Sequence, residues 1–182
     1  MGDEPLRFKN IRTKKIPVVM DTRMLDSIIA FIYKDSVLRT RKVLRNIMEL
    51  FDILDDEIYM DKPKLSSRVW IIRKTLEAMV KKDFINDELI KQYCLDDPDC
   101  DSYTASIIND IDNLKISHDE SRYLIKQIED RLQYGYVLNV KDIAQKLFNR
   151  IDQDDFKTYR SVQDSLYDLA VSIVNNRRAI SS

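Results

Sequence analysis

The stretch that decides the fold class is SHDESRYLIKQIEDRLQYGYV, residues 117–137. It opens with a capping box, in which Ser117 and Glu120 can each accept a hydrogen bond from the other's backbone N–H. Apolar residues then recur at the three- and four-residue spacing of a helix: Leu124, Ile125, Ile128, Leu132 and Val137. The stretch therefore predicts a long amphipathic helix, which Gly135 weakens near its end or kinks.

The same signals recur on both sides of this stretch. Cap residues and apolar stripes predict seven further helices over about 21–34, 37–51, 66–82, 87–93, 102–114, 140–151 and 156–174. Asp21, Asn86 and Asn139 are the expected caps of three of them. No segment alternates clearly as a strand does. The sequence predicts an all-α fold of about eight helices, a helical bundle with a long helical hairpin in its C-terminal third.

One break interrupts this series. Asp96, Asp97, Pro98 and Asp99 do not continue a helix comfortably, because proline blocks it and restricts the residue before it. We therefore expect a basic N-terminal arm (1–20), a helical subdomain (21–95), an acidic linker (96–101) and a second helical subdomain (102–182). The chain ends without a Gly or Pro stop, which is compatible with a piece of a longer protein and equally with a natural terminus.

The composition excludes several classes of function. The chain of 182 residues has only two glycines, Gly2 and Gly135, so it contains no glycine-rich phosphate loop. No apolar run approaches the roughly 18–20 residues of a membrane span. The charged N-terminus lacks the apolar core of a signal peptide. These features predict a cytoplasmic protein.

The residues that often carry metal or catalytic chemistry do not form a recognisable set. Asp97, Asp99 and Asp101 have the spacing of a calcium loop, but Ser102 and Ile108 replace the glycine and the bidentate glutamate that such a loop needs. The acidic break is therefore interpreted as a solvated linker.

Histidine and cysteine give no stronger signal. His118 lies inside the capping box and has no evident nucleophile to serve. Cys94 and Cys100 are interpreted as reduced thiols of a cytosolic chain. We therefore expect no metal, no cofactor and no enzymatic activity in this chain.

Two basic clusters are candidate nucleic-acid contacts, although the formal net charge is only −1. Phosphate contacts require such cationic segments. The first cluster is the N-terminal arm, and the second lies at the start of the helix expected over 37–51. Their residues are Arg7, Lys9, Arg12, Lys14, Lys15, Arg39, Arg41, Lys42 and Arg45.

Residues 116–138, ISHDESRYLIKQIEDRLQYGYVL, and the helical pair that follows through Arg178 resemble the N-terminal region of phage-encoded DnaB-type hexameric replicative helicases. The resemblance covers mainly 116–178. It implies an all-helical domain that forms the collar of a ring around DNA through helical-hairpin contacts. It also implies a docking face for a primase or a helicase loader. The parent protein would be an ATP-dependent DNA helicase, but its ATP-binding motifs are absent from these 182 residues.

On this interpretation the chain is a non-catalytic assembly and partner-docking domain in DNA replication, in a bacterial host cytoplasm. It would associate with itself as a ring or dimer. Tyrosine is enriched at protein interfaces and is frequent in the last third of the chain. The expected contact residues are Tyr123, Ile128, Arg131, Tyr134, Tyr159 and Tyr167.

Two alternatives remain open at this point. One is a stand-alone DNA-binding or regulatory protein, with a helix-turn-helix within 21–82 and salt-sensitive phosphate contacts from the basic clusters. The other is an adaptor or inhibitor that binds a larger protein. Nothing in the sequence separates the adaptor from the assembly domain.

Overall fold

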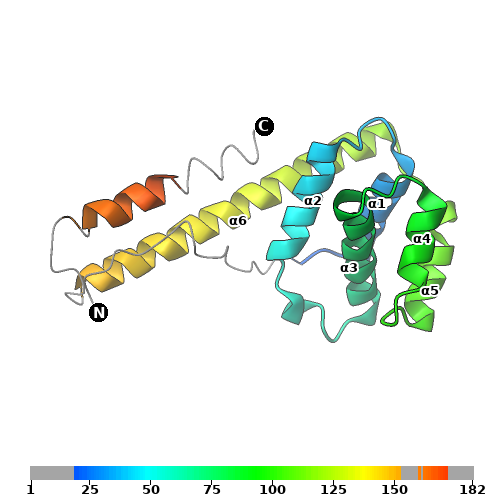
Figure 1. The fold of residues 1–182 in the computed structure, drawn as a ribbon, viewed down its shortest axis with the longest axis horizontal. Coiled ribbons are helices and arrows are strands. Elements are labelled where there is room, and N and C mark those ends of the chain that lie inside the picture. The colour runs from blue at the N-terminus through cyan, green and yellow to red at the C-terminus, as the bar shows by residue number, and fades with distance from the viewer. Residues whose placement is uncertain (1–18, 153–159, 161, 172–182) are drawn as a thin grey trace. The chain divides into compact units, whose positions relative to one another are not determined.

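The computed structural model describes residues 19–152, 160 and 162–171, and Figure 1 draws their helices as a ribbon. Every element in these ranges is a helix, which confirms the all-α prediction. The α-helices are α1 (Thr22–Lys34), α2 (Arg41–Ile53), α3 (Pro63–Leu76), α4 (Asp87–Leu95), α5 (Ser102–Asn109) and α6 (His118–Asp152). Short 3₁₀ turns η2 (Asp56–Ile58) and η4 (Ile111–Asn113), a π-helix η3 (Glu77–Lys81) and a helical segment over 162–171 complete the fold. The number of helices is close to the predicted eight.

The chain divides into two compact units, and the boundary lies inside α6. The larger unit is Pro17–Arg131, and the second contains the described residues from Leu132 onward. The predicted subdomains 21–95 and 102–182 do not match these units. The reason is that α4 and α5, which flank residues 96–101, pack against each other and against α3.

The acidic residues of this connection have structural partners. Lys74 Nζ donates to Asp97 Oδ2 at 2.6 Å. Asp101 caps α5 by accepting a hydrogen bond from the backbone N of Thr104 at 2.7 Å. Residues 96–101 therefore join two packed helices of one unit and do not separate two subdomains.

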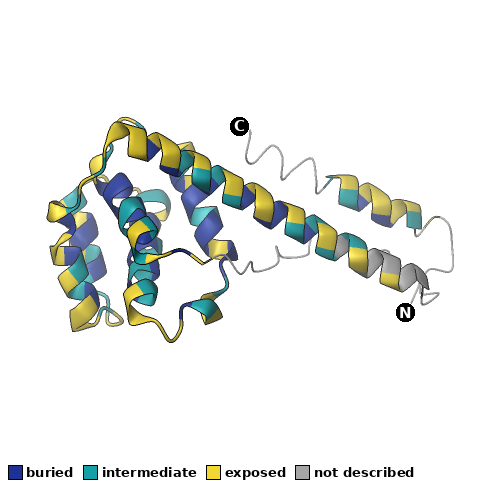
Figure 2. Ribbon diagram, turned by 180° about the vertical axis from the view of Figure 1, so that it is seen from behind, coloured by how far each residue is buried: buried dark blue, intermediate teal, exposed yellow. Residues whose placement is uncertain are grey.

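α1 forms the centre of the larger unit. Residues Ile28 to Tyr33 are buried in an unbroken run, as Figure 2 shows for this unit by its dark blue segments. A helix that is apolar on all sides must be surrounded by other elements. α3 supplies much of this cover, because it packs against α1 and also against α2, α4 and α5.

The helix ends follow the expected cap chemistry at most positions. Asp21 and Asn86 accept hydrogen bonds from backbone N–H groups of the first turns of α1 and α4, as predicted. Thr40, not Val37, sets the start of α2, because its hydroxyl accepts from Val43 N at 3.3 Å. α3 begins at Pro63, since proline suits the first helical position, where no N–H is required.

α6 is one helix of 35 residues, where the sequence predicts two. Asn139, the predicted cap of a separate helix, lies inside α6 and is buried. Gly135 does not end the helix. A glycine inside a helix costs roughly 1 kcal/mol relative to alanine. Burial of neighbouring Leu132 and Tyr136 contributes about 1.5–3 kcal/mol for each large side chain and outweighs that cost.

Candidate functional site

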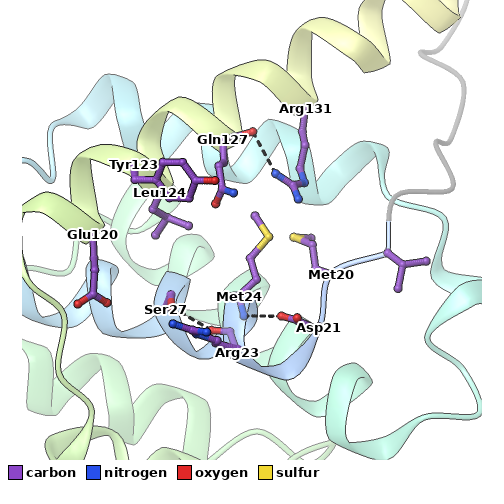
Figure 3. A pocket seen from close by; sticks show the side chains of 11 residues that line it. Met20, Asp21, Arg23, Met24, Ser27, Glu120, Tyr123, Leu124, Gln127 and Arg131 are labelled. Atoms are coloured by element: carbon purple, nitrogen blue, oxygen red, sulfur yellow. Dashed lines mark hydrogen bonds between the residues drawn. The ribbon is translucent and has the colours of Figure 1, made fainter.

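A groove of about 420 Å³ lies between the first turns of α1 and of α6, within the larger unit. Figure 3 shows Met20 and Met24 on one side of it and Tyr123, Leu124 and Arg131 on the α6 side. A capping hydrogen bond fixes the N-terminus of each of these helices. Asp21 Oδ1 accepts from Met24 N at 2.8 Å, and Ser117 Oγ accepts from Glu120 N at 3.1 Å.

The floor of the groove is apolar. Met20 and Leu124 are buried, and Met24 is half-buried. The backbone of Met20 is fixed because its N–H donates to the hydroxyl of Tyr59 at 3.2 Å. Methionine side chains adapt to irregular apolar partners because they are unbranched and polarizable. The floor is therefore suited to receive an apolar side chain.

The rim of the groove is polar and carries both signs of charge. Arg23, Glu120 and Arg131 line it, together with Gln127. Arg131 Nη1 donates to the backbone oxygen of Gln127 at 3.4 Å, and Figure 3 draws this bond. Tyr123 stands beside them with 66% of its surface exposed. An apolar floor with a polar, aromatic rim is typical of a protein-binding surface.

Two of the predicted contact residues of α6 line this groove, and a third does not. Tyr123 and Arg131 do so, whereas Ile128 is only 1% exposed. The prediction of Ile128 as a contact was wrong. With Leu124 and Leu132 it forms the buried stripe of α6, so it stabilises the fold and cannot reach a partner.

The second unit is a helical hairpin, which we define as Leu132–Asp152 of α6 together with the helical segment 162–171; Figure 1 shows its two arms side by side. The hairpin exposes large apolar side chains. Their exposed fractions are 53% for Tyr134, 63% for Val137, 49% for Leu166 and 71% for Tyr167. We call these four residues together the hairpin face, as a name for the set, since Leu166 and Tyr167 are consecutive in their helix and point about 100° apart. Tyr134 and Tyr167 were predicted as contacts, and the predicted Tyr159 lies outside the described residues.

The hairpin also buries polar side chains. Asn139, Ser165 and Asp168 are buried there beside Leu132 and Tyr136. Sequence reasoning missed Val137 and Leu166 as contact residues, and helical spacing assigned Val137 to the apolar stripe of its helix. The signal that would have found them is the position of the polar residues Asn139, Ser165 and Asp168 in the same helices. Where polar residues take the buried side of a helix, apolar residues at the other positions are exposed.

The basic cluster of α2 is partly neutralised by its own unit. The guanidinium of Arg39 hydrogen-bonds the backbone oxygen of Ile32 and lies 3.9 Å from a carboxylate oxygen of Asp87. Arg41 pairs with Asp83 at 2.8 Å.

Lys42 and Arg45 are exposed. The predicted contacts of the arm, Arg7, Lys9, Arg12, Lys14 and Lys15, lie outside the described residues.

The cysteines are both free thiols, and Cys94 is buried. Burial raises the pKa of the Cys94 thiol to about 11, so this thiol is protonated at neutral pH. Its sulfur lies 3.7 Å from the hydroxyl of Thr75, which in turn hydrogen-bonds Tyr33 at 2.9 Å. This cluster is part of the core and lacks an opening for a substrate.

Among the residues that the structure describes, no group of three or more His, Cys, Asp and Glu side chains could hold a metal ion. None of the helices described is long and apolar enough to cross a membrane. Comparison of the chain with protein families, with curated proteins and with solved structures gave no match.

Proposed function

We propose that this chain is a non-catalytic assembly domain that associates with a second copy of itself through the hairpin face. The observation that carries the proposal is the polarity of the hairpin, which buries Asn139, Ser165 and Asp168 while exposing four large apolar side chains. Exposed apolar patches of this kind mark interaction sites, because covering them removes apolar surface from water.

The charge of the hairpin supports a second copy as the occupant. The exposed charged residues beside the hairpin face include Lys141, Arg160 and Asp164, so both signs are present. In a two-fold interface the same surface lies on both sides and must complement itself. A face with charges of both signs does so without strong repulsion. The resemblance to helicase collar domains supports the same proposal, because it implies contacts between copies through a helical hairpin.

The proposal assigns partner docking to the groove between α1 and α6. Neither Arg23 nor Arg131 has a carboxylate partner among the ion pairs of the described residues, so a partner carboxylate can pair there. An apolar side chain of the partner would lie over Met24. A primase or a helicase loader is the partner that the resemblance predicts. We expect Arg131→Glu to weaken binding of a primase from the same replication system at least tenfold, and unchanged binding would refute this assignment.

Sedimentation analysis of the whole chain over a range of concentrations tests self-association. The variant carrying Tyr134→Ser and Tyr167→Ser should weaken association at least tenfold, because buried interface tyrosines each contribute roughly 1–2 kcal/mol or more. Tyr123→Ser is the matched control, since it removes an equally exposed tyrosine from the larger unit. A chain that stays monomeric at high concentration, or a control that weakens association equally, would contradict the proposal.

A further inference from the structure

A second apolar groove lies in the larger unit, along the seam where α2 packs against η3 and the end of α3. Two cavities, of about 190 and 140 Å³, follow one another along it. On α2, Leu44 lines the first cavity, and Met48 and Phe51 line the second. This part of α2 covers about two turns, or about 12 Å. The groove therefore has the length of a short helix.

The end of the groove presents an apolar side chain that the fold does not use. Ile85 lines the first cavity and is 90% exposed. It directly precedes Asn86, the cap of α4. An apolar residue at this position usually packs against the fourth residue of the helix, which is Ile90. Ile90 is fully buried and Ile85 is not, so this contact is absent and the Ile85 side chain is available to a partner.

The backbone around Ile85 is held in an uncommon conformation. η3 is a π-helix, an element that occurs often at functional sites. η3 ends at Lys81, and two residues later Asp83 has φ 56°, a left-handed conformation that costs free energy in a non-glycine residue. The ion pair of Asp83 with Arg41 and the ring contact of Phe84 with Tyr93, at 5.7 Å between centroids, fix this turn. The left-handed conformation of Asp83 lowers the stability of the fold, and the turn that contains it exposes Ile85.

The charges along the groove are unequal. Its lining residues include four cations, Arg39, Arg41, Arg73 and Lys81, and two anions, Asp52 and Glu77. The three arginines pair with carboxylates of the same unit, so Lys81 is the lining cation that remains for a partner. Arg45 adds a cation on the α2 side, because it lies one helical turn after Arg41. Arg45 and Lys81 are exposed and have no carboxylate partner among the described residues. An incoming segment with carboxylates would therefore be attracted.

We propose that the groove between α2 and η3 binds an acidic amphipathic helix of a partner protein. The apolar face of that helix packs on Leu44, Met48 and Ile85, and its carboxylates pair with Arg45 and Lys81. Helix-in-groove recognition works in this way, with apolar anchors repeating every three to four residues. The apolar lining favours such a helix over a nucleic acid, whose phosphates need cations and gain nothing from apolar side chains. The inference does not depend on self-association of the hairpin.

Titration of the whole chain with synthetic helical peptides of about 15 residues tests the proposal. The acidic probe carries leucine at helical spacing and glutamate elsewhere, and the control probe replaces each glutamate with lysine. We expect the acidic probe to bind and to shift the backbone amide resonances of Leu44 and Ile85. Binding should weaken as salt rises. No binding at millimolar peptide, or equal binding of the two probes, would overturn the proposal.

Variants locate the site. Ile85→Ser should weaken binding of the acidic probe at least fivefold, whereas Leu89→Ser, at an exposed residue outside the lining, should not. Arg45→Glu with Lys81→Glu should weaken it at least tenfold. Arg122→Glu with Lys126→Glu changes the net charge equally on α6 and should not.

Equal loss in the control pair would overturn the proposal. A single-stranded oligothymidylate would also overturn it if it bound more tightly than the peptide and if Arg45→Glu with Lys81→Glu abolished its binding. The surface would then be a nucleic-acid site. Thermal unfolding of each variant checks that the fold is retained.

Discussion

The larger unit and the hairpin use their apolar residues in different ways. In the larger unit the apolar side chains of α1 are enclosed by neighbouring helices, and Phe31 and Ile32 have no exposed surface. In the hairpin, Leu132 and Tyr136 are buried, but so are Asn139, Ser165 and Asp168, while Tyr134 and Tyr167 face outward. The first arrangement stabilises an independent fold. The second leaves large apolar side chains of the described residues exposed to solvent.

The largest expected effect separates the two regions by stability. Phe31→Ala removes a fully buried aromatic side chain from the centre of the larger unit. We expect the free energy of unfolding to fall by about 3–5 kcal/mol. This loss combines the hydrophobic free energy of the removed ring atoms with the cost of the cavity that they leave behind. Urea unfolding followed by circular dichroism measures it. A loss below about 1 kcal/mol would show that α1 is not the centre of the core.

An intermediate effect concerns protection of the backbone. If the hairpin is covered by a second copy, its amide hydrogen exchange should slow as protein concentration rises. Well above the dissociation constant of a dimer, the monomer fraction falls with the square root of concentration, so exchange should slow by about threefold for each tenfold rise. Exchange in α1 should not depend on concentration. Exchange measured by mass spectrometry at two concentrations compares the two regions in one sample. Equal concentration dependence in both, or none in the hairpin, would remove the distinction between them.

The smallest effect lies in the larger unit and depends on pH. The pKa of Asp97 is held below its usual value of 3.8, because Lys74 donates to the carboxylate and so does the backbone N–H of Asp99. A depressed folded pKa contributes stability above the unfolded pKa, and this stability is lost as pH falls through the folded pKa. Asp97→Asn should therefore show a shallower loss of stability below about pH 4.

Urea midpoints measured between about pH 6 and pH 3 test this expectation. Asp164→Asn, on the exposed side of the hairpin, is the matched control. If stability falls as steeply with decreasing pH in Asp97→Asn as in the wild-type chain, the pair between Asp97 and Lys74 does not form in solution.

Local sequence signals predicted much of the fold. Caps such as Asp21 and Ser117 were correct, and so were the stripe positions Leu124, Ile128 and Leu132 of α6, because these depend on residues within one or two turns. The signals failed where long-range packing decided the outcome. Asn139 has the chemistry of a cap, but the enclosure of Leu132 and Tyr136 keeps α6 continuous through it.

The candidate sites were harder to predict from the sequence. Helical periodicity identifies an apolar stripe but not what covers it, so Ile128 was assigned to an interface and Val137 to a core. In the structure Ile128 is buried and Val137 is exposed. The groove between α2 and η3 gave no sequence signal, because its π-helix and the positive φ of Asp83 arise from packing and not from a local pattern.

The most direct test of the account is whether the hairpins of two copies lie against each other. One chain, without isotope label, would carry Cys100→Ser and a spin label at Lys141→Cys. It would be mixed with an isotope-labelled chain that carries no spin label. The account predicts intermolecular line broadening at the amides of Tyr134, Val137 and Leu166, and none in α1. Broadening confined to the larger unit, or absent throughout at concentrations where the chain sediments as a dimer, would contradict it.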